Sequence, residues 1–391
     1  MAKDEGKKLC VLELAKKMNR EFKDSNMSLM ADVVPEYTRL ATGSFGLDYV
    51  LYGGMPYGRI IKVSGLQHAG KTTGACRILA EYQKQNPDKI CVYVDVEHSL
   101  DLKFQMKING VDLNKLVYVN PPAGMSGEDI LQLILDYQSA DDIGMIVLDS
   151  IPALVPQIVL DSDMTEDKGM RATMAKKLYP FLSIMSSEVQ SKNNIFMLIN
   201  QVREVAGAMP GSITYKEPGG KAPEYFSSVC IRFGTRTFTL GENMDACKKE
   251  DGLGADGFRL KFKITKNKTA AVNRAGGFIT YRYKTGPDKV NDLLEIAFKF
   301  DYIKRLNNVT YQLIDLFTGE IYEDENGEIL QGKKAELIEY LKTHPDFLDQ
   351  YINMVTRYIS SDDVETGSAL DEEDLAEITA QEALVARNVE D

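Results

Sequence analysis

The stretch VSGLQHAGKTTGAC, residues 63–76, decides the interpretation of the rest of the chain. From Gly65 to Thr72 it fits the pattern GxxxxGK(S/T). Glycines let a loop wrap closely enough for its N–H groups to face phosphate oxygens, and a helix that begins there adds its partly positive N-terminus. Lys71 supplies a full charge to the β- and γ-phosphates, and the Thr72 hydroxyl is a hard ligand for Mg²⁺. The stretch predicts a nucleotide site, against the alternative of a mere tight turn.

The segments on both sides of this loop supply the context that the pattern needs. RIIKVS, residues 59–64, is a short β-branched run typical of a strand. TTGACRILAEYQKQ, residues 72–85, has apolar side chains at helical spacing and ends before Pro87. The loop residues predicted to bind the nucleotide are Gly65, Leu66, Gln67, His68, Ala69, Gly70, Lys71, Thr72 and Thr73.

Four further apolar runs follow the loop and alternate with segments at helical spacing. They are ICVYVD (90–95), LVYVN (116–120), MIVLD (145–149) and NIFMLIN (194–200). This alternation predicts an α/β fold with a mostly parallel, doubly wound sheet. The later runs SSVCIRF, GFRLKFKITK and GGFITYRY have no helical segment between them, so we expect antiparallel strands that extend one edge of the sheet.

Two carboxylates follow predicted strands. Asp149 ends MIVLD, at the edge of an open parallel sheet where ligands collect, and we expect it to hold a metal ion through water. A simple strand cap is the alternative. Glu97 lies two residues beyond ICVYVD on the same edge, where a carboxylate can polarise the water that attacks a γ-phosphate. From spacing alone, a surface salt bridge is an equal alternative for Glu97.

Composition restricts the class of protein. The chain has 391 residues, 44% of them apolar, which is enough for a conventional core. No window approaches the ~20 apolar residues that span a bilayer, and the N-terminus lacks the apolar run of a signal peptide. The five cysteines and three histidines are scattered without metal-ligand spacing. We therefore expect free thiols, no structural zinc, no membrane partner and a cytoplasmic protein.

The two ends of the chain differ from its middle, residues 36–287. We expect residues 1–35 to form a helix and a strand that dock elsewhere as an arm, and residues 288–360 to form a small α+β domain. Residues 361–391 hold eleven acidic residues and one arginine, or −10 of the net charge of −12. Such a tail is usually solvated and disordered, and it can also compete with nucleic acid for basic surface elsewhere.

Over nearly all of residues 5–350, the chain resembles the RecA recombinases of bacteria. The motifs that carry the resemblance, in order, are ATGSFGLDYVLYGGMPYGRIIKVSGLQHAGKTT (41–73), DVEHSLD (95–101), IVLDSIPALVP (146–156), INQVR (199–203), EPGGKAPEYFSSV (217–229), ITKNKTAAVNR (264–274) and GEILQGKKAELIEYLKTHPD (327–346). The resemblance implies a RecA-like P-loop ATPase core, and it makes the N-terminal arm an oligomerisation element. Residues 66–69, LQHA, depart from the usual loop of the family, and such departures suit a bacteriophage member of the family as well as a bacterial one.

The resemblance also implies roles around ATP and Mg²⁺. Glu97 is the general base for water, and Gln201 senses the γ-phosphate and passes the signal into the loop that follows. Asp101 and Phe104 match residues that contact and stack on adenine, with Phe104 in place of the usual tyrosine. Lys71, Thr72 and Asp149 keep the phosphate and metal roles expected above.

Lys266 and Lys268 match lysines that, in the family, reach into the ATP of a neighbouring subunit. By themselves, two lysines on a short β segment are usually solvated edge charge. Supplied across an interface, they would stabilise γ-phosphate charge as an arginine finger does. The resemblance therefore implies an ATP enclosed between subunits of a helical filament.

Two long loops resemble the family's contacts with single-stranded DNA. In the second loop, residues 203–221, Met209 matches the inserting methionine, but Pro210 replaces the adjacent phenylalanine, for which Tyr215 is the candidate substitute. In the first loop, residues 157–170, a lysine replaces a methionine whose contact Met164 or Met170 would take over. The predicted DNA-binding residues are Arg203, Met209, Pro210, Tyr215, Lys216, Gly219, Gly220, Lys168, Met170 and Arg171.

The implied function is a DNA-dependent ATPase that forms filaments on single-stranded DNA and catalyses homologous pairing and strand exchange in recombination and repair. The implied partners are single- and double-stranded DNA, further copies of the chain and, as candidates, single-strand-binding and mediator proteins. Two alternatives stay open: a ring helicase or branch-migration ATPase on the same core, and a nucleotide-gated scaffold that scarcely hydrolyses ATP. Residues 236–256 exceed the family's hairpin in length and receive no function from the sequence.

Overall fold

The computed structural model describes residues 38–98, 106–162, 170–204, 215–241, 245–246, 254–270, 274–299 and 301–360. The predicted arm and the predicted acidic tail lie outside these residues. Both therefore stay predictions, as do the predicted domain boundaries.

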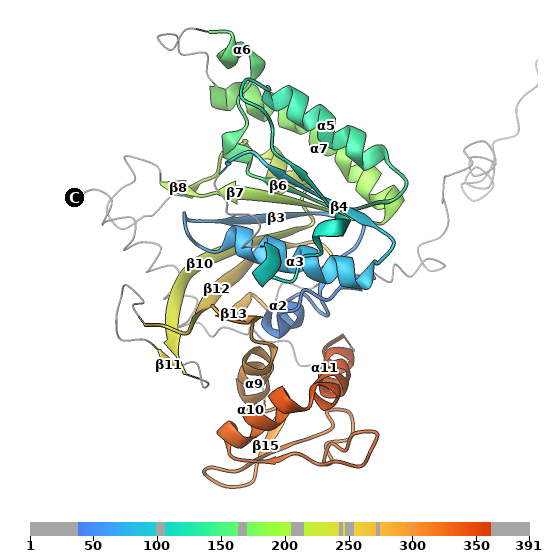
Figure 1. Cartoon of the computed structure of the whole chain (residues 1–391), viewed down its shortest axis with the longest axis vertical. Coiled ribbons are helices and arrows are strands. Elements are labelled where there is room, and N and C mark those ends of the chain that lie inside the picture. Colours follow the sequence, from blue (N-terminus) through green and yellow to red (C-terminus); the bar gives the residue numbers. More distant parts are fainter. Residues whose placement is uncertain are drawn as a thin grey trace, which may run out of the picture. The chain divides into compact units, whose positions relative to one another are not determined.

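A 10-stranded sheet forms the centre of the described core (Figure 1). Its strand order is β14-β13-β12-β10-β3-β7-β6-β4-β5, and β11 pairs with β10. Neighbours are parallel from β10 to β5 and antiparallel from β10 to β14, which confirms the predicted parallel sheet with an antiparallel extension. The strands are β3 (Arg59–Gly65), β4 (Ile90–Asp95), β5 (Leu116–Val119), β6 (Ile143–Asp149), β7 (Ile195–Gln201), β10 (Val229–Leu240), β11 (Asp245–Ala246), β12 (Gly257–Asn267), β13 (Gly276–Arg282) and β14 (Gly286–Pro287).

Helices cover both faces of this sheet. The helix α3 (Lys71–Gln85) lies on one face, and α5 (Gly127–Ser139) and α7 (Met170–Lys192) lie on the other (Figure 1). Successive residues of β3 enter different apolar clusters, since Ile61 packs on the α3 side and Ile60 on the side of α5 and α7. Because both faces are covered, the strands are continuous apolar runs, which is what made them recognisable in the sequence.

Two glycines shape the turn between β3 and α3. A Cβ added at Gly65 would lie 2.5 Å from the carbonyl oxygen of Phe233, so only a residue without a side chain lets the loop leave the sheet beside β10. Gly70 precedes the helix with a φ of 72°, in the left-handed region that favours glycine. The loop conformation is therefore set by the residues that the motif requires.

The residues that follow the large sheet form helices and a second, three-stranded sheet with the order β15-β16-β17. Tyr302 of this part contacts Tyr49 edge to face, with ring centroids 6.5 Å apart, and it accepts a hydrogen bond at its carbonyl oxygen from the Tyr351 hydroxyl at 3.0 Å. The elements are α9 (Lys289–Lys299), β15 (Ile303–Arg305), β16 (Tyr311–Leu313), β17 (Gln331–Gly332), α10 (Lys334–Thr343) and α11 (Pro345–Ser360).

Short elements complete the described chain. They are β1 (Arg39–Leu40), α2 (Phe45–Val50), β2 (Met55–Pro56), η2 (Leu113–Lys115), η3 (Ile151–Ala153), α6 (Gln157–Leu160), β8 (Arg203–Glu204), β9 (Tyr215–Lys216) and α8 (Ala222–Phe226). Within the described ranges, no helix is both long enough and apolar enough to cross a membrane.

Candidate functional site

A pocket of about 300 Å³ opens where β3, β6 and β7 end. Its lining residues are Gln67, His68, Gly70, Lys71, Thr72, Thr73, Glu97, Asp149, Gln201 and Arg236. All of these except Arg236 belong to the nucleotide site that the sequence predicted. The fold brings them together because the carboxyl ends of parallel strands meet at one edge of a sheet.

Asp149 lies at the centre of a hydrogen-bonded group in this pocket. Its Oδ2 accepts a hydrogen bond from the Thr72 hydroxyl at 2.9 Å and another from the Tyr93 hydroxyl at 2.7 Å. Burial raises the pKa of Asp149 to about 6, although these two hydrogen bonds oppose the shift. A hydroxyl beside a carboxylate is a pair of hard oxygen donors, so the residues present fit a Mg²⁺ ion.

Lys71 is buried at the start of α3 and faces the same pocket. Its Nζ donates to the carbonyl oxygen of Leu66 at 2.6 Å, within the glycine-bracketed loop. Burial lowers the pKa of Lys71, and the charges of Glu97 and Asp149 oppose this shift. An ammonium group has three N–H donors, so a contact with one carbonyl oxygen leaves the group able to bind phosphate oxygens.

Glu97 and Gln201 contact each other in the pocket. The Nε2 of Gln201 donates to Oε1 of Glu97 at 2.5 Å, and the Ser150 hydroxyl donates to the same oxygen. Gln201 ends β7, so the contact joins a pocket carboxylate to the last residue of a central strand. A carboxylate held in this way beside the phosphate loop can accept a proton from water.

Lys266 and Lys268 do not line this pocket. Lys266, near the end of β12, donates to the carbonyl oxygens of Glu224 and Tyr225 in α8, and Lys268 donates to that of Tyr225 at 3.2 Å. Burial lowers the pKa of Lys266. The predicted contact of these lysines with the nucleotide of a neighbouring copy therefore stays a prediction.

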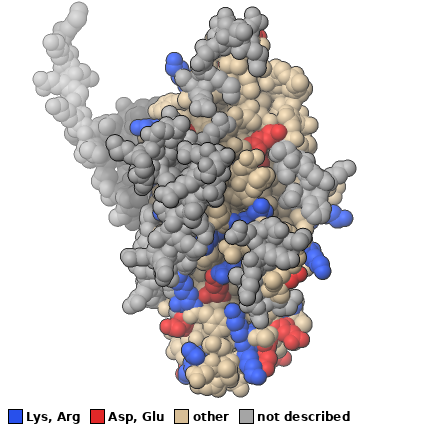
Figure 2. All heavy atoms as spheres, turned by 90° about the vertical axis from the view of Figure 1, so that its left-hand side faces the viewer, with Lys and Arg blue, Asp and Glu red and all other residues tan. Residues whose placement is uncertain are grey.

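The predicted second DNA-binding loop, residues 203–221, contains a two-stranded ribbon. β8 and β9 pair in antiparallel fashion, with Arg203 opposite Lys216. Gly219 and Gly220 follow β9 with φ values of 89° and 72°. Figure 2 shows the side of the core that carries β8 in Figure 1, and its described surface has Asp and Glu side chains among the Lys and Arg side chains.

Other predicted residues have no described side chains. Asp101, Phe104, Lys168, Met209 and Pro210 lie outside the described residues. Met164 lies outside them as well. For a second group, the backbone belongs to β8, β9 or α7 but the side chain is not described. This group consists of Arg203, Tyr215, Lys216, Met170 and Arg171. The adenine contacts and the base-inserting residues therefore stay predictions.

Arg236 is a pocket residue that the sequence did not indicate. It lies on β10 opposite Leu260 of β12, and its guanidinium carbon is 5.3 Å from the centroid of the Phe258 ring. The register between these strands shifts between Phe233 and Arg236. Strand periodicity alone cannot locate such an irregularity, so it could not tell which side chains of this hairpin face the phosphate loop.

Comparisons with known proteins agree on one family. Residues 10–286 match the family model described as the RecA N-terminal domain. The protein named Protein RecA of Mesoplasma florum is 33% identical over 313 residues, which cover 80% of this chain and 84% of the relative. Protein RecA of Aquifex aeolicus is 30% identical over 347 residues, which cover 88% of this chain and 91% of the relative. Protein RecA of Campylobacter hominis is 28% identical over 382 residues, which cover 97% of this chain and 100% of the relative.

Proposed function

Because this chain belongs to the RecA family of DNA-dependent ATPases that act in recombination and repair, we propose that the pocket around Lys71 is its ATP site and that Gln201 links this site to DNA. The observation that carries the proposal is the hydrogen bond from Gln201 to Glu97. It joins a carboxylate of the pocket to a residue that lies two positions before the ribbon β8–β9.

Each pocket residue then has a chemical role. The phosphate loop and Lys71 bind the β- and γ-phosphates, with the partly positive start of α3 behind them. Thr72 and, through water, Asp149 would hold Mg²⁺, which when bound neutralises charge that develops on the phosphates. Glu97 takes the proton of the attacking water, and its hydrogen bonds to Ser150 and Gln201 fix its orientation.

In this proposal the site is completed by assembly. Lys266 and Lys268 of a neighbouring copy approach the γ-phosphate, so that hydrolysis depends on the filament. Residues 1–35 dock on an adjacent copy of the core, residues 36–287. The C-terminal domain, residues 288–360, is followed by a tail that competes with DNA.

The proposed partners and location follow from the same role. Single-stranded DNA binds the two predicted loops, which are residues 157–170 at the start of α7 and residues 203–221 around the ribbon. Duplex DNA is the second substrate of pairing and strand exchange. Single-strand-binding and mediator proteins are further proposed partners, and the cytoplasm is the proposed location.

The experiment that tests this function measures ATP hydrolysis with and without single-stranded DNA at low salt, with the same samples imaged by negative-stain electron microscopy. We expect the rate to rise sharply with DNA, and open helical filaments to form. A rate indifferent to DNA would count against the proposal, and closed rings would favour a helicase.

A substitution of the proposed base separates turnover from binding. In Glu97→Gln, we expect the rate of hydrolysis to fall by about 10²–10⁴-fold, because the amide of glutamine cannot accept the proton of water. Binding of a fluorescent ATP analogue and of DNA should persist. The control is Glu320→Gln, which changes an exposed acid in the C-terminal part. Hydrolysis by Glu97→Gln at the wild-type rate would assign the base to another residue.

A further inference from the structure

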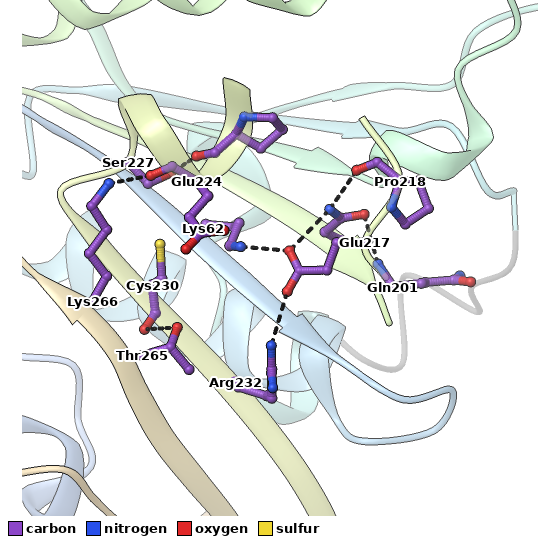
Figure 3. A network of polar contacts seen from close by, with 12 residues as sticks. Lys62, Gln201, Glu217, Pro218, Glu224, Ser227, Cys230, Arg232, Thr265 and Lys266 are labelled. Carbon is purple, nitrogen blue, oxygen red and sulfur yellow. Dashed lines mark hydrogen bonds and ion pairs between the residues drawn. The ribbon is translucent and has the colours of Figure 1, made fainter. Parts of the chain in front are cut away.

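A buried ion pair lies where the ribbon β8–β9 returns to the core. Glu217 follows β9 directly, and its Oε2 is 2.6 Å from Nζ of Lys62. Its other oxygen, Oε1, is 3.6 Å from Nη2 of Arg232 (Figure 3). The side chains of Lys62 and Glu217 are only 4% and 16% exposed, so both charges are largely removed from water. Neither residue lines the proposed ATP pocket.

The two cations come from one face of adjacent parallel strands. Lys62 of β3 lies opposite Cys230 of β10, and Arg232 lies opposite Ser64, two residues beyond Lys62. Positions two apart on a strand share a face. Ile60 lies on this face as well, and it belongs to the apolar cluster beneath α7. A lysine in such surroundings is strongly unfavourable unless an acid neutralises it, which is what Glu217 does.

Asn200 connects this ion pair to the proposed ATP site. Its Oδ1 accepts a hydrogen bond from the backbone N–H of Gln201 at 3.0 Å, and its Nδ2 donates to the carbonyl oxygen of Pro218 at 3.0 Å. The same Nδ2 lies 3.5 Å from Oε2 of Glu217. Asn200 is fully buried, so each of its polar atoms needs its partner. One side chain therefore bridges Gln201 and the residue next to Glu217.

Both ends of the ribbon are fixed as a result. Gln201 lies two residues before β8 and is held by Glu97, and Glu217 lies one residue after β9 and is held by Lys62. Since β8 and β9 are hydrogen-bonded to each other, these two ends are also joined through the ribbon.

We propose that Glu217 is a positioning residue that anchors the returning end of the DNA-binding loop to β3, so that DNA binding and the Gln201–Glu97 contact change together. The inference rests on the proposed function, because it takes the ribbon as the base of a DNA-binding loop. With the anchor lost, Asn200 and the pairing of β8 with β9 are the remaining links of this end to Gln201, and DNA binding in the loop alters the ATP pocket less.

The first test is Glu217→Gln, which keeps the size of the side chain and removes its charge. We expect the stimulation of ATP hydrolysis by single-stranded DNA to fall on the order of tenfold, and the DNA concentration for half-stimulation to rise, because coupling between the two sites is lost. Affinity for a fluorescent ATP analogue without DNA should change by less than about twofold. Glu217→Asp restores the charge and should recover most of the stimulation.

Two further variants identify the partner and exclude a general effect. In the double variant Lys62→Met with Glu217→Gln, the stimulation of ATP hydrolysis by DNA should match that of the more impaired single variant within about twofold. The two losses should not add, because the two residues act as a pair. The matched control is Glu295→Gln, which removes a half-exposed acid paired with Arg259 and should leave stimulation unchanged. If Glu217→Gln does not fold, Lys62→Met alone carries the same expectation.

Two results would overturn the inference. One is normal DNA stimulation in Glu217→Gln. The other is that Glu217→Gln loses affinity for the ATP analogue and stimulation by DNA to the same extent, and that Glu217→Asp recovers neither. Such a result would mean that the ion pair only supports the fold. A failure of the proposed function has a different signature, because the wild-type protein itself would then show no stimulation by DNA.

Discussion

The proposed ATP pocket and the junction where α2 and α9 meet β13 both bury carboxylates, but with different surroundings. Asp149 borders a cavity of about 300 Å³ that also exposes Lys71. At the junction, Asp292 is enclosed: it accepts hydrogen bonds from the Ser44 hydroxyl at 2.9 Å and from the Thr280 N–H at 2.7 Å. Burial raises the pKa of Asp292 to about 7. A buried acid thus indicates a ligand site where it borders space that a counter-charge can enter, and a structural role where neutral donors surround it.

Removing the cation of the pocket should have the largest effect. In Lys71→Ala, we expect DNA-stimulated hydrolysis to fall about a thousandfold, because no other group of this loop brings a full charge to the phosphates. The steady-state rate at saturating ATP checks this. Lys84→Ala, which changes an exposed lysine of the same helix, is the control. Normal ATP hydrolysis by Lys71→Ala would show that the pocket needs no counter-charge, and the pocket would then no longer differ from the junction around Asp292 in this respect.

The next largest effect concerns cations that lie outside the pocket of their own chain. In the double variant Lys266→Ala with Lys268→Ala, we expect hydrolysis to lose its response to single-stranded DNA, a decrease of roughly a hundredfold, because the proposed function has these charges supplied across subunits. Binding of an ATP analogue to dilute protein without DNA should be kept. Lys284→Ala, in the turn after β13, is the control. Full DNA-stimulated activity in the double variant would show that the pocket is complete within one chain.

A smaller effect is expected at the pocket wall. Arg236→Gln should raise the KM for ATP by about fivefold, because a half-exposed cation contributes on the order of 1 kcal/mol to binding a charged ligand. The KM is measured over a range of salt concentrations, and its salt dependence should weaken in the variant. Arg305→Gln, which changes an exposed arginine in the C-terminal part, is the control. An unchanged KM would leave Arg236 as a packing partner of Phe258.

The smallest effect should be seen at the junction, in stability alone. The pKa of Asp292 is about 7 in the folded chain and near its ordinary value of 3.8 when unfolded, so the folded state binds the proton more tightly. Its contribution to stability is complete below pH ~4 and is lost as the pH rises through 7. Between pH 6 and 8, the free energy of unfolding should fall by about 1 kcal/mol more in the wild type than in Asp292→Asn.

Urea unfolding at each pH measures this difference. Asp48, whose pKa burial also raises to about 7, should leave part of the pH dependence in the Asp292→Asn variant. Equal slopes in both proteins would mean that Asp292 is already ionised in the fold.

Local pattern was enough to predict the sheet and most of the pocket. The phosphate loop lies between a strand and a helix that each have a clear period, and Asp149 ends an apolar run whose direction in a parallel sheet follows from the alternation. These inferences need only residues within one element and the rule that parallel strands align their carboxyl ends.

Contacts between distant segments could not be predicted in this way. Lys62 and Glu217 are 155 positions apart, and their pairing depends on where the ribbon returns to the sheet. In the sequence, Lys62 is one polar residue in a β-branched run, and Glu217 is one acid in a glycine-rich loop. Arg236 depends in addition on a register shift between β10 and β12. Such features follow from tertiary geometry, which periodicity does not encode.

The placement of β3 has a consequence for synthesis of the protein on the ribosome. This strand pairs with residues 195–201 on one side and with residues 229–233 on the other. Its second neighbour is therefore translated about 170 residues after it, which takes roughly 10 to 30 seconds at ordinary elongation rates. During that interval the apolar strand β3 has emerged without one or both of its neighbouring strands. The phosphate loop is thus among the earlier functional segments of the nascent chain to be made, and among the later ones to reach its native surroundings.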